Sequence, residues 1–129
     1  MRLHTIAQTT GIATTAERLL LRLDDPRAVV VRVRRLRYDD GQLLSYEEVV
    51  LPIARLPHDA DYNQDVLALA TQHGLTLGRA TEFVLRVPAD ATVATHLGVA
   101  VGATALKLDR VAETADGLPI EWRVAYSVP

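Results

Sequence analysis

The chain has 129 residues, 49% of them hydrophobic and 23% charged, and a formal net charge of −2 at pH 7. This size favours one domain, and the near-neutral charge argues against an overall positive field that would attract nucleic acid or an acidic membrane. The absence of cysteine excludes disulfides, thiolate zinc sites and thiol catalysis, and it fits a cytoplasmic protein.

The N-terminal part of the chain predicts a strand, a helix and a β-hairpin. Residues 1–9 favour the strand, and Thr14 or Thr15 is the expected N-cap of the helix. Residues 28–51 predict the hairpin, with its tight turn at Asp39-Asp40-Gly41. The expected apolar side of the helix consists of Ala16, Leu19, Leu20 and Leu23.

The remainder predicts a helix, a strand, a short helix and a second hairpin. Aspartate begins both helices, and glycine is the expected end of the first of them. The strand follows from its alternation of apolar and polar residues. The expected bounds are a helix from Asp59 or Asp61 to Gly74, a strand at 75–87, a helix from Asp90 to Leu97, and strands at 103–114 and 118–128.

The two halves of the chain resemble each other. Arg35 and Arg110 each follow an apolar strand segment and are 75 residues apart, and the turn residues Gly41 and Gly117 are 76 apart. A helix-strand-turn-strand unit used twice predicts an α+β fold, with a single antiparallel sheet and helices packed on one of its faces.

Four charged residues lie on strand faces that are otherwise apolar. Arg35 and Arg37 continue the side of Val29, Val31 and Val33, while Glu47 and Arg79 share sides with leucine and valine. Charges are rarely buried unless they are paired. One interpretation is a structural ion pair such as Arg37 with Glu47. The other is a surplus of guanidinium groups that binds a small anion, unless these strand ends simply lead out to solvent.

The last hairpin is less clear. Glu121 and Arg123 lie opposite an apolar side that includes Trp122 and Tyr126. They are either solvated, which the pattern by itself favours, or the other face of the sheet holds a cleft. The four histidines lack metal-ligand spacing, and no catalytic or nucleotide-binding motif occurs. We therefore expect no metal, cofactor or catalytic residue. No uncharged apolar run approaches the length of a membrane span.

The order of short motifs resembles the effector-binding (UTRA) domain of GntR-type bacterial transcription regulators of the HutC group. The motifs are Arg35-x-Arg37, Asp40-Gly41, Tyr46-Glu47, Leu51-Pro52, Gly74-Leu75-x-Leu77-x-Arg79-Ala80, Ala94-x-x-Leu97-Gly98-Val99, Leu108-x-Arg110-Val111 and Gly117-x-Pro119-Ile120-Glu121. The resemblance implies a chorismate-lyase-like fold and a pocket for a small metabolite, often a phosphosugar or another organic anion. It also implies that the pocket is lined by Arg35, Arg37, Glu47, Arg79 and Glu121.

One segment departs from the family pattern. Many phosphosugar-binding members have Ser-Leu-Tyr at the start of the middle helix, where this chain has Gln64, Asp65 and Val66. The departure predicts either a different anion or a pocket that has lost its ligand.

The resemblance also bears on partners. We expect a homodimeric ligand sensor whose DNA contacts are made only through a winged-helix domain. Because none precedes Met1, we expect either a fragment of a longer regulator or a stand-alone domain. The alternative is an enzyme of the chorismate-lyase type, in which arginine and glutamate would bind an aromatic carboxylate substrate and assist elimination.

Overall fold

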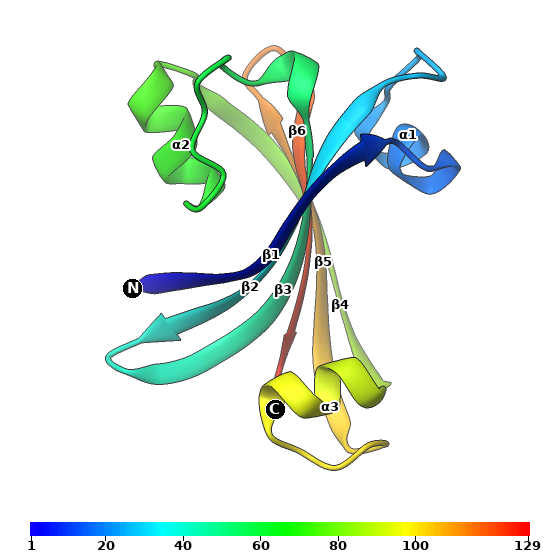
Figure 1. Ribbon diagram of the computed structural model, residues 1–129, viewed down its shortest axis with the longest axis vertical. Coiled ribbons are helices and arrows are strands. Elements are labelled where there is room, and N and C mark those ends of the chain that lie inside the picture. Colours follow the sequence, from blue (N-terminus) through cyan, green and yellow to red (C-terminus); the bar gives the residue numbers. More distant parts are fainter.

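Six antiparallel strands form one twisted sheet in the order β1-β2-β3-β6-β5-β4 (Figure 1). The computed structural model describes residues 1–129, and it confirms the predicted α+β class. None of the helices has the length and apolar character needed to cross a lipid bilayer. The elements are β1 (Arg2–Ile12), α1 (Thr15–Leu21), β2 (Val29–Asp39), β3 (Gln42–Pro52), the 3-10 turn η1 (Ile53–Arg55), α2 (Val66–His73), β4 (Leu77–Pro88), α3 (Ala91–Leu97), β5 (Thr104–Thr114) and β6 (Pro119–Ser127).

The β2–β3 hairpin closes at the predicted turn. Asp40 and Gly41 have φ values of 49° and 76°, as a type I′ turn requires. Aspartate and glycine tolerate this left-handed backbone better than other residues, so the sequence fixes the position of the turn. The turn pairs Asp39 with Gln42, and further along the hairpin Arg35 lies directly across from Glu47.

The predicted duplication is visible in the topology. β1-α1-β2-β3 and β4-α3-β5-β6 follow the same course, and β3 pairs with β6 at the centre of the sheet. The first residues of β2 and β5, Val29 and Thr104, are 75 residues apart, which matches the predicted offset. The strand order therefore reads as two three-stranded halves that meet along their last strands.

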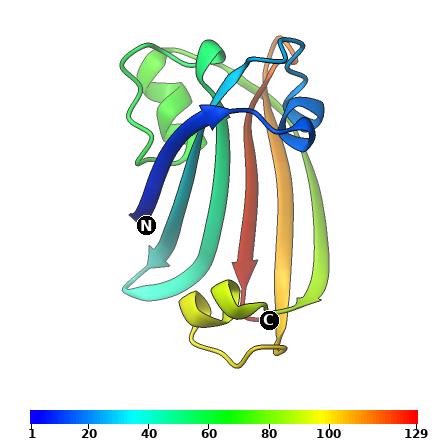
Figure 2. The same cartoon turned by 45° about the vertical axis from the view of Figure 1, so that its right-hand side comes forward.

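The helices cover both faces of the sheet, so the prediction of helices on one face is wrong (Figure 2). α2 packs through Val66 and Leu69 on the side of Val31, Val33 and Val49, which we call the α2 face. The opposite face of the sheet carries Val30 and Tyr46. It is covered by α1 near Val30 and by α3 near Tyr46. The helix of each half, α1 or α3, packs on this opposite face. α2 lies between the two halves in the chain and packs on the α2 face.

Two helix starts match the sequence analysis and one does not. Thr14 caps α1 in a capping box with Glu17, and Asp90 caps α3. The N-cap of α2 is Asp65, whose side chain accepts from the backbone N–H of Leu67. The prediction of Asp59 or Asp61 is therefore wrong, because several aspartates precede this helix and local capping preference does not choose among them.

The predicted buried side of α1 is also wrong. Leu19 is 75% exposed and Leu20 is 38% exposed, whereas Leu21 is fully buried between Ala13 and Val30. The helix is only seven residues long and ends at Arg22 in a left-handed conformation. Because so short a helix buries little more than its last turn, its periodicity does not determine which side meets the sheet.

Candidate functional site

The α2 face carries a cluster of charged residues, the arginine cluster, which is built from both hairpins. β2 contributes Arg35 and Arg37, β3 contributes Glu47, and β6 contributes Glu121 and Arg123. The neighbouring strands β3 and β6 pair Glu47 with Ala125 and Val49 with Arg123, which brings the two hairpins together here. Residues that are more than 70 positions apart in the chain thus share one site.

Glu47 is the shared acceptor of the arginine cluster. Its carboxylate accepts from Arg35 Nε at 3.0 Å, from Arg37 Nε at 2.7 Å and from Ser45 Oγ at 2.8 Å. Arg123 Nη1 lies at 3.4 Å from the same carboxylate. Burial opposes ionisation of Glu47, but the hydrogen bond and charge of Arg37, with the charges of Arg35 and Arg123, lower its pKa to about 2. Glu47 is therefore ionised and fully engaged by the protein.

Glu121 has the opposite character, although it lies in the same cluster. Its side chain is buried, and its Oε1 atom has no hydrogen-bond partner. The nearest cation is Arg123, whose Nε lies 3.9 Å away. Burial raises the pKa of Glu121, and the charges of Arg123 and Arg35 offset this only in part. The pKa values of the two carboxyl groups of the site are thus shifted in opposite directions, down for Glu47 and up for Glu121.

Four residues that line one cavity have a buried polar atom without a hydrogen-bond partner. The cavity has a volume of about 290 Å³ and lies between the sheet and the start of α2. An unpaired buried donor or acceptor costs about 1–3 kcal/mol, so a group of them in one place indicates a missing polar ligand. The unpartnered atoms are Arg35 Nη2, Arg110 Nε, Arg123 Nε and Glu121 Oε1. The lining residues are Arg35, Arg37, Asp65, Val66, Leu67, Leu77, Arg110, Glu121 and Arg123.

The structure brings together four of the five predicted site residues. Arg35, Arg37 and Glu121 line the cavity. Glu47 does not line it but accepts hydrogen bonds from both arginines. The prediction that Arg79 shares the buried apolar side of its strand is wrong: Arg79 is exposed and does not line the cavity. The register of β4 shifts between Leu77 and Ala80, so the alternation used to place Arg79 is interrupted there.

Sequence reasoning missed two arginines of the cavity. Arg110 and Arg123 line the cavity, where Arg79 was expected instead. For Arg123 a signal existed, since it shares a strand side with Glu121, but solvation was the favoured interpretation and is wrong. Its side chain is only 16% exposed. The cleft on the other face of the sheet, the second alternative, is the one that the structure contains.

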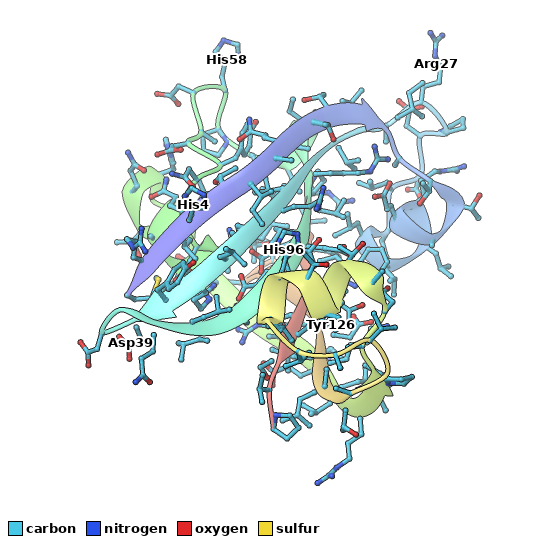
Figure 3. All side chains as sticks on the ribbon, turned by 60° about the horizontal axis from the view of Figure 1, so that its bottom comes forward. His4, Arg27, Asp39, His58, His96 and Tyr126 are labelled. Atoms are coloured by element: carbon cyan, nitrogen blue, oxygen red, sulfur yellow. The ribbon has the colours of Figure 1, made fainter.

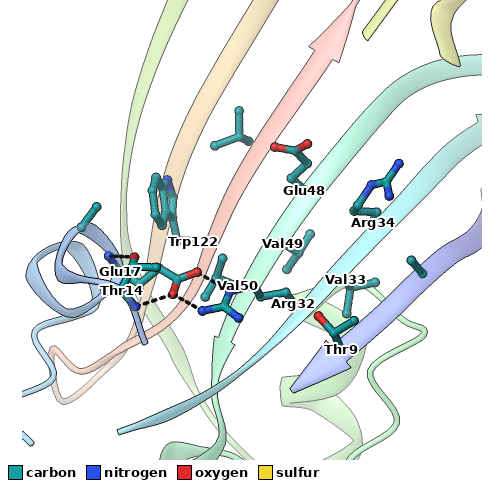
Figure 4. Close-up of a pocket in the computed structure, with 13 residues that line it drawn as sticks. Thr9, Thr14, Glu17, Arg32, Val33, Arg34, Glu48, Val49, Val50 and Trp122 are labelled. Atoms are coloured by element: carbon teal, nitrogen blue, oxygen red, sulfur yellow. Dashed lines mark hydrogen bonds and ion pairs between the residues drawn. The ribbon is translucent and has the colours of Figure 1, made fainter. Parts of the chain in front are cut away.

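A second cavity, of about 430 Å³, lies on the opposite face between β1, α1 and the central strands (Figure 4). Its floor is largely apolar and includes Val50 and Trp122. Its buried carboxylate, Glu17, accepts two hydrogen bonds from Arg32, at 2.8 and 2.7 Å. Because this charge is already neutralised, the second cavity lacks the unpartnered ionic atoms that mark the arginine cluster.

The histidines are dispersed over the molecule. Figure 3 shows His4 on β1, His58 in the connection before α2 and His96 on α3. No group of three or more histidine, aspartate or glutamate side chains is arranged to hold a metal ion.

The family model described as the UTRA domain matches residues 2–129. The chain belongs to the UTRA domain family. The match extends over both hairpins and the helix inserted between them, so it includes every residue of the arginine cluster. No curated protein sequence matches the chain.

Solved structures of regulators have the same fold as this UTRA domain. A GntR-family transcriptional regulator from Enterococcus faecalis V583 superposes with a TM-score of 0.85 at 20% identity, covering 97% of this chain and 91% of that one. The effector domain of PhnF from Mycobacterium smegmatis gives 0.86 at 23% identity, covering 97% and 78%. Against the longer PhnF chain the TM-score is 0.85 at 23% identity, and the UTRA domain covers 97% of its own length but 56% of PhnF. The UTRA domain is an effector-sensing domain of a transcription regulator.

Proposed function

We propose that the arginine cluster binds a small anionic metabolite and that this binding controls contact with DNA by a separate winged-helix domain of the regulator. The observation that carries the proposal is the buried guanidinium of Arg35, a residue that lines the cavity: its Nη2 has no partner, although its other nitrogens are paired. Arginine presents a planar fork of donors that suits carboxylate and phosphate groups. As a sensor that acts with DNA in a bacterium, the protein would work in the cytoplasm.

Binding can be transmitted through α2 and the connection before it. The first residues of α2, Val66 and Leu67, line the cavity, and Arg35 Nη1 donates to the backbone oxygen of Gln64 at 3.3 Å. In the same connection Asn63 accepts a hydrogen bond from Thr5 of β1. A ligand that favours one position of this connection therefore shifts β1 as well, since it changes the relative free energies of two arrangements.

A second copy of the chain is the partner we propose for the β4 edge of the sheet. Phe83, Val84 and Leu85 are 65%, 61% and 55% exposed there, on both sides of an edge strand. β1, the other edge, presents polar residues such as Gln8 and Thr9 instead. An apolar edge strand with unpaired backbone groups favours antiparallel pairing with its own copy about a two-fold axis.

Sedimentation equilibrium tests the proposed dimer. The wild type should sediment as a dimer and Phe83→Glu as a monomer, while Thr9→Glu on the β1 edge should remain dimeric. A monomeric wild type, or an unchanged dimer in Phe83→Glu, would show that β4 is not the interface.

Thermal denaturation with a panel of metabolite anions tests ligand sensing. We expect at least one anion to raise the melting temperature of the wild type, and Arg37→Ala to abolish that rise without loss of the fold. The matched control is Arg34→Ala, which removes an arginine from the same strand but from the opposite face. An equal response in the two variants would contradict the proposed site. Release of pyruvate from chorismate by the wild type would support the lyase instead.

A further inference from the structure

Asp65 places a negative charge at the wall of the arginine cavity. Its Oδ1 accepts from Leu67 N at 2.7 Å and thereby caps α2, while its Oδ2 lies 4.0 Å from Arg37 Nη1. The side chain is 25% exposed, so it contacts solvent and cavity together. Capping requires only one side-chain oxygen, and asparagine caps helices about as well as aspartate. The charge of Asp65 is therefore not needed for the helix and acts on whatever occupies the cavity.

The charges that surround the cavity leave room for one further negative charge. Arg35, Arg37 and Arg123 supply three positive charges, and Glu47 and Asp65 supply two negative ones, which leaves a sum of +1. Arg110 is not counted because its Nη1 pairs with Glu82 at 2.8 Å. Counting Glu121 as ionised lowers the sum to zero. In either state a dianion would bring one more uncompensated negative charge next to Asp65 than a monoanion would, which costs free energy in a partly buried site.

The other lining residues of the cavity indicate what the uncharged part of the ligand should be like. Val66, Leu67 and Leu77 are apolar, and the side-chain amide of Gln64 is engaged by Gln72 at 2.7 Å. Arg123 Nε and Glu121 Oε1 lie unpartnered on the sheet side. A cavity of about 290 Å³ is at the lower end of small-molecule sites. These features fit a compact molecule with an apolar side and a hydrogen-bonding substituent.

We propose that the effector is a small monocarboxylate rather than a phosphate monoester, and that Asp65 is the residue that sets this preference. The inference rests on the proposed ligand-sensing function of the same cavity. A carboxylate carries one charge at neutral pH, whereas a phosphate monoester carries about −1.5 to −2. The carboxylate satisfies the free guanidinium nitrogens with a single negative charge, while the phosphate monoester would bring a further like charge beside Asp65.

Four probe pairs, each made of a carboxylate and a phosphate, test the preference by calorimetry and thermal shift at pH 7.5. The pairs are acetate and inorganic phosphate, glycerate and glycerol 3-phosphate, gluconate and glucose 6-phosphate, and benzoate and phenyl phosphate. In the wild type we expect the carboxylate of each responding pair to bind more tightly. Asp65→Asn should shift the affinity ratio toward the phosphate by about tenfold or more.

The control variant is Asp61→Asn, which removes the same charge from the connection outside the cavity and should leave the ratio unchanged. Asp61 accepts a local hydrogen bond from Asn63 N at 2.9 Å and does not line the cavity. A wild type that prefers phosphates, or a ratio that Asp65→Asn does not change, would overturn the inference and leave anion sensing intact. No response of any variant to any probe would overturn the ligand-sensing function, and the inference with it.

Discussion

Arg35 in the first hairpin and Arg110 in the second occupy equivalent places, 75 residues apart, but the residues across from them differ. Arg35 faces Glu47, and the two side chains form a buried ion pair at 3.0 Å. Arg110 faces Arg123, and the Nε atoms of both are left without a partner. Opposite charges across a strand pair stabilise a sheet, and like charges destabilise it.

This difference shows how a duplicated unit yields the proposed binding site. The first hairpin pairs both Arg35 and Arg37 with one carboxylate, Glu47, so it supplies a fixed scaffold. The second hairpin carries Arg123, whose Nε has no partner although its Nη1 reaches Glu47, and Glu121, whose pKa is raised by burial. Because β3 and β6 are neighbours, Arg123 and Glu121 of the second hairpin lie beside the ion pairs of the first. A protein that keeps such a mismatch is less stable without its ligand and gains stability on binding.

The largest expected effect comes from Glu47→Gln. The substitution keeps the shape of the side chain but leaves the buried Arg35 without its counter-charge, so the free energy of unfolding should fall by about 3–5 kcal/mol. Urea denaturation measures it. Glu48→Gln, the adjacent position on the opposite face, should cost about 1 kcal/mol or less. Equal losses would show that the ion pair of the first hairpin is not a scaffold.

Acid should remove the same stabilisation. The pKa of Glu47 is about 2 in the folded protein, against an ordinary value of 4.5. A lowered pKa contributes stability that is complete above pH 4.5 and is lost as the pH falls toward 2, a change of about 3 kcal/mol. Denaturant melts between pH 6 and 2 measure it, and Glu47→Gln should lack this part of the decline. A wild type and variant with parallel pH profiles would contradict the assignment.

Glu121→Gln should raise the stability of the protein, whereas Glu47→Gln lowers it. A raised pKa means that stability is complete below the ordinary value and declines as the pH rises and the buried carboxyl group ionises. The uncharged amide avoids this loss, so the variant should be more stable than the wild type at pH 7 by about 1–3 kcal/mol. Thermal melts from pH 4 to 8 should show the two proteins converging at the acid end. A variant that is less stable at pH 7 would mean that Glu121 is paired as an anion.

The smallest expected change in stability belongs to Arg123→Met. The substitution removes one of two facing like charges and keeps a long side chain, so stability should stay within about 1 kcal/mol of the wild type. The rise in melting temperature produced by an anion should nevertheless be lost, because the surplus charge is gone. Arg35→Met, in contrast, should impair the fold and the anion response together. A severe loss of stability in Arg123→Met would show that Arg123 stabilises the fold, as Arg35 does.

Several features were predictable because their causes are local. The Asp40-Gly41 turn follows from the backbone conformations that these residues tolerate. A register shift between Arg37 and Tyr38, which the turn does not set, brings Arg35 across from Glu47. Within each strand, side chains alternate between the two faces of the sheet. From that alternation the burial of Arg35 and Glu47 was expected, and both are 1% exposed. The offset between the halves likewise comes from the repeated pattern of strands and turns. The motifs that resemble the UTRA domain supplied the family.

Other parts of the site could not be predicted from local patterns. The burial expected for Arg79 failed because the register of β4 shifts beside it, where Gly78 lies so close to β5 that an added Cβ would be 2.7 Å from the oxygen of Thr114. Glu121 and Arg123 looked like an ordinary polar strand side, and only the pairing of β6 with β3 and the cover of α2 bury them.

The sequence by itself determined the strands, the first turn, the duplication and the charges that each strand carries, because these depend on residues close together in the chain. The tertiary structure decided which charges meet. Pairing across the centre of the sheet set Arg123 beside Glu47, and the start of α2 set Asp65 beside Arg37. These contacts join residues 76 and 28 positions apart, and such distances are closed only by folding, when burial makes each unpaired charge costly.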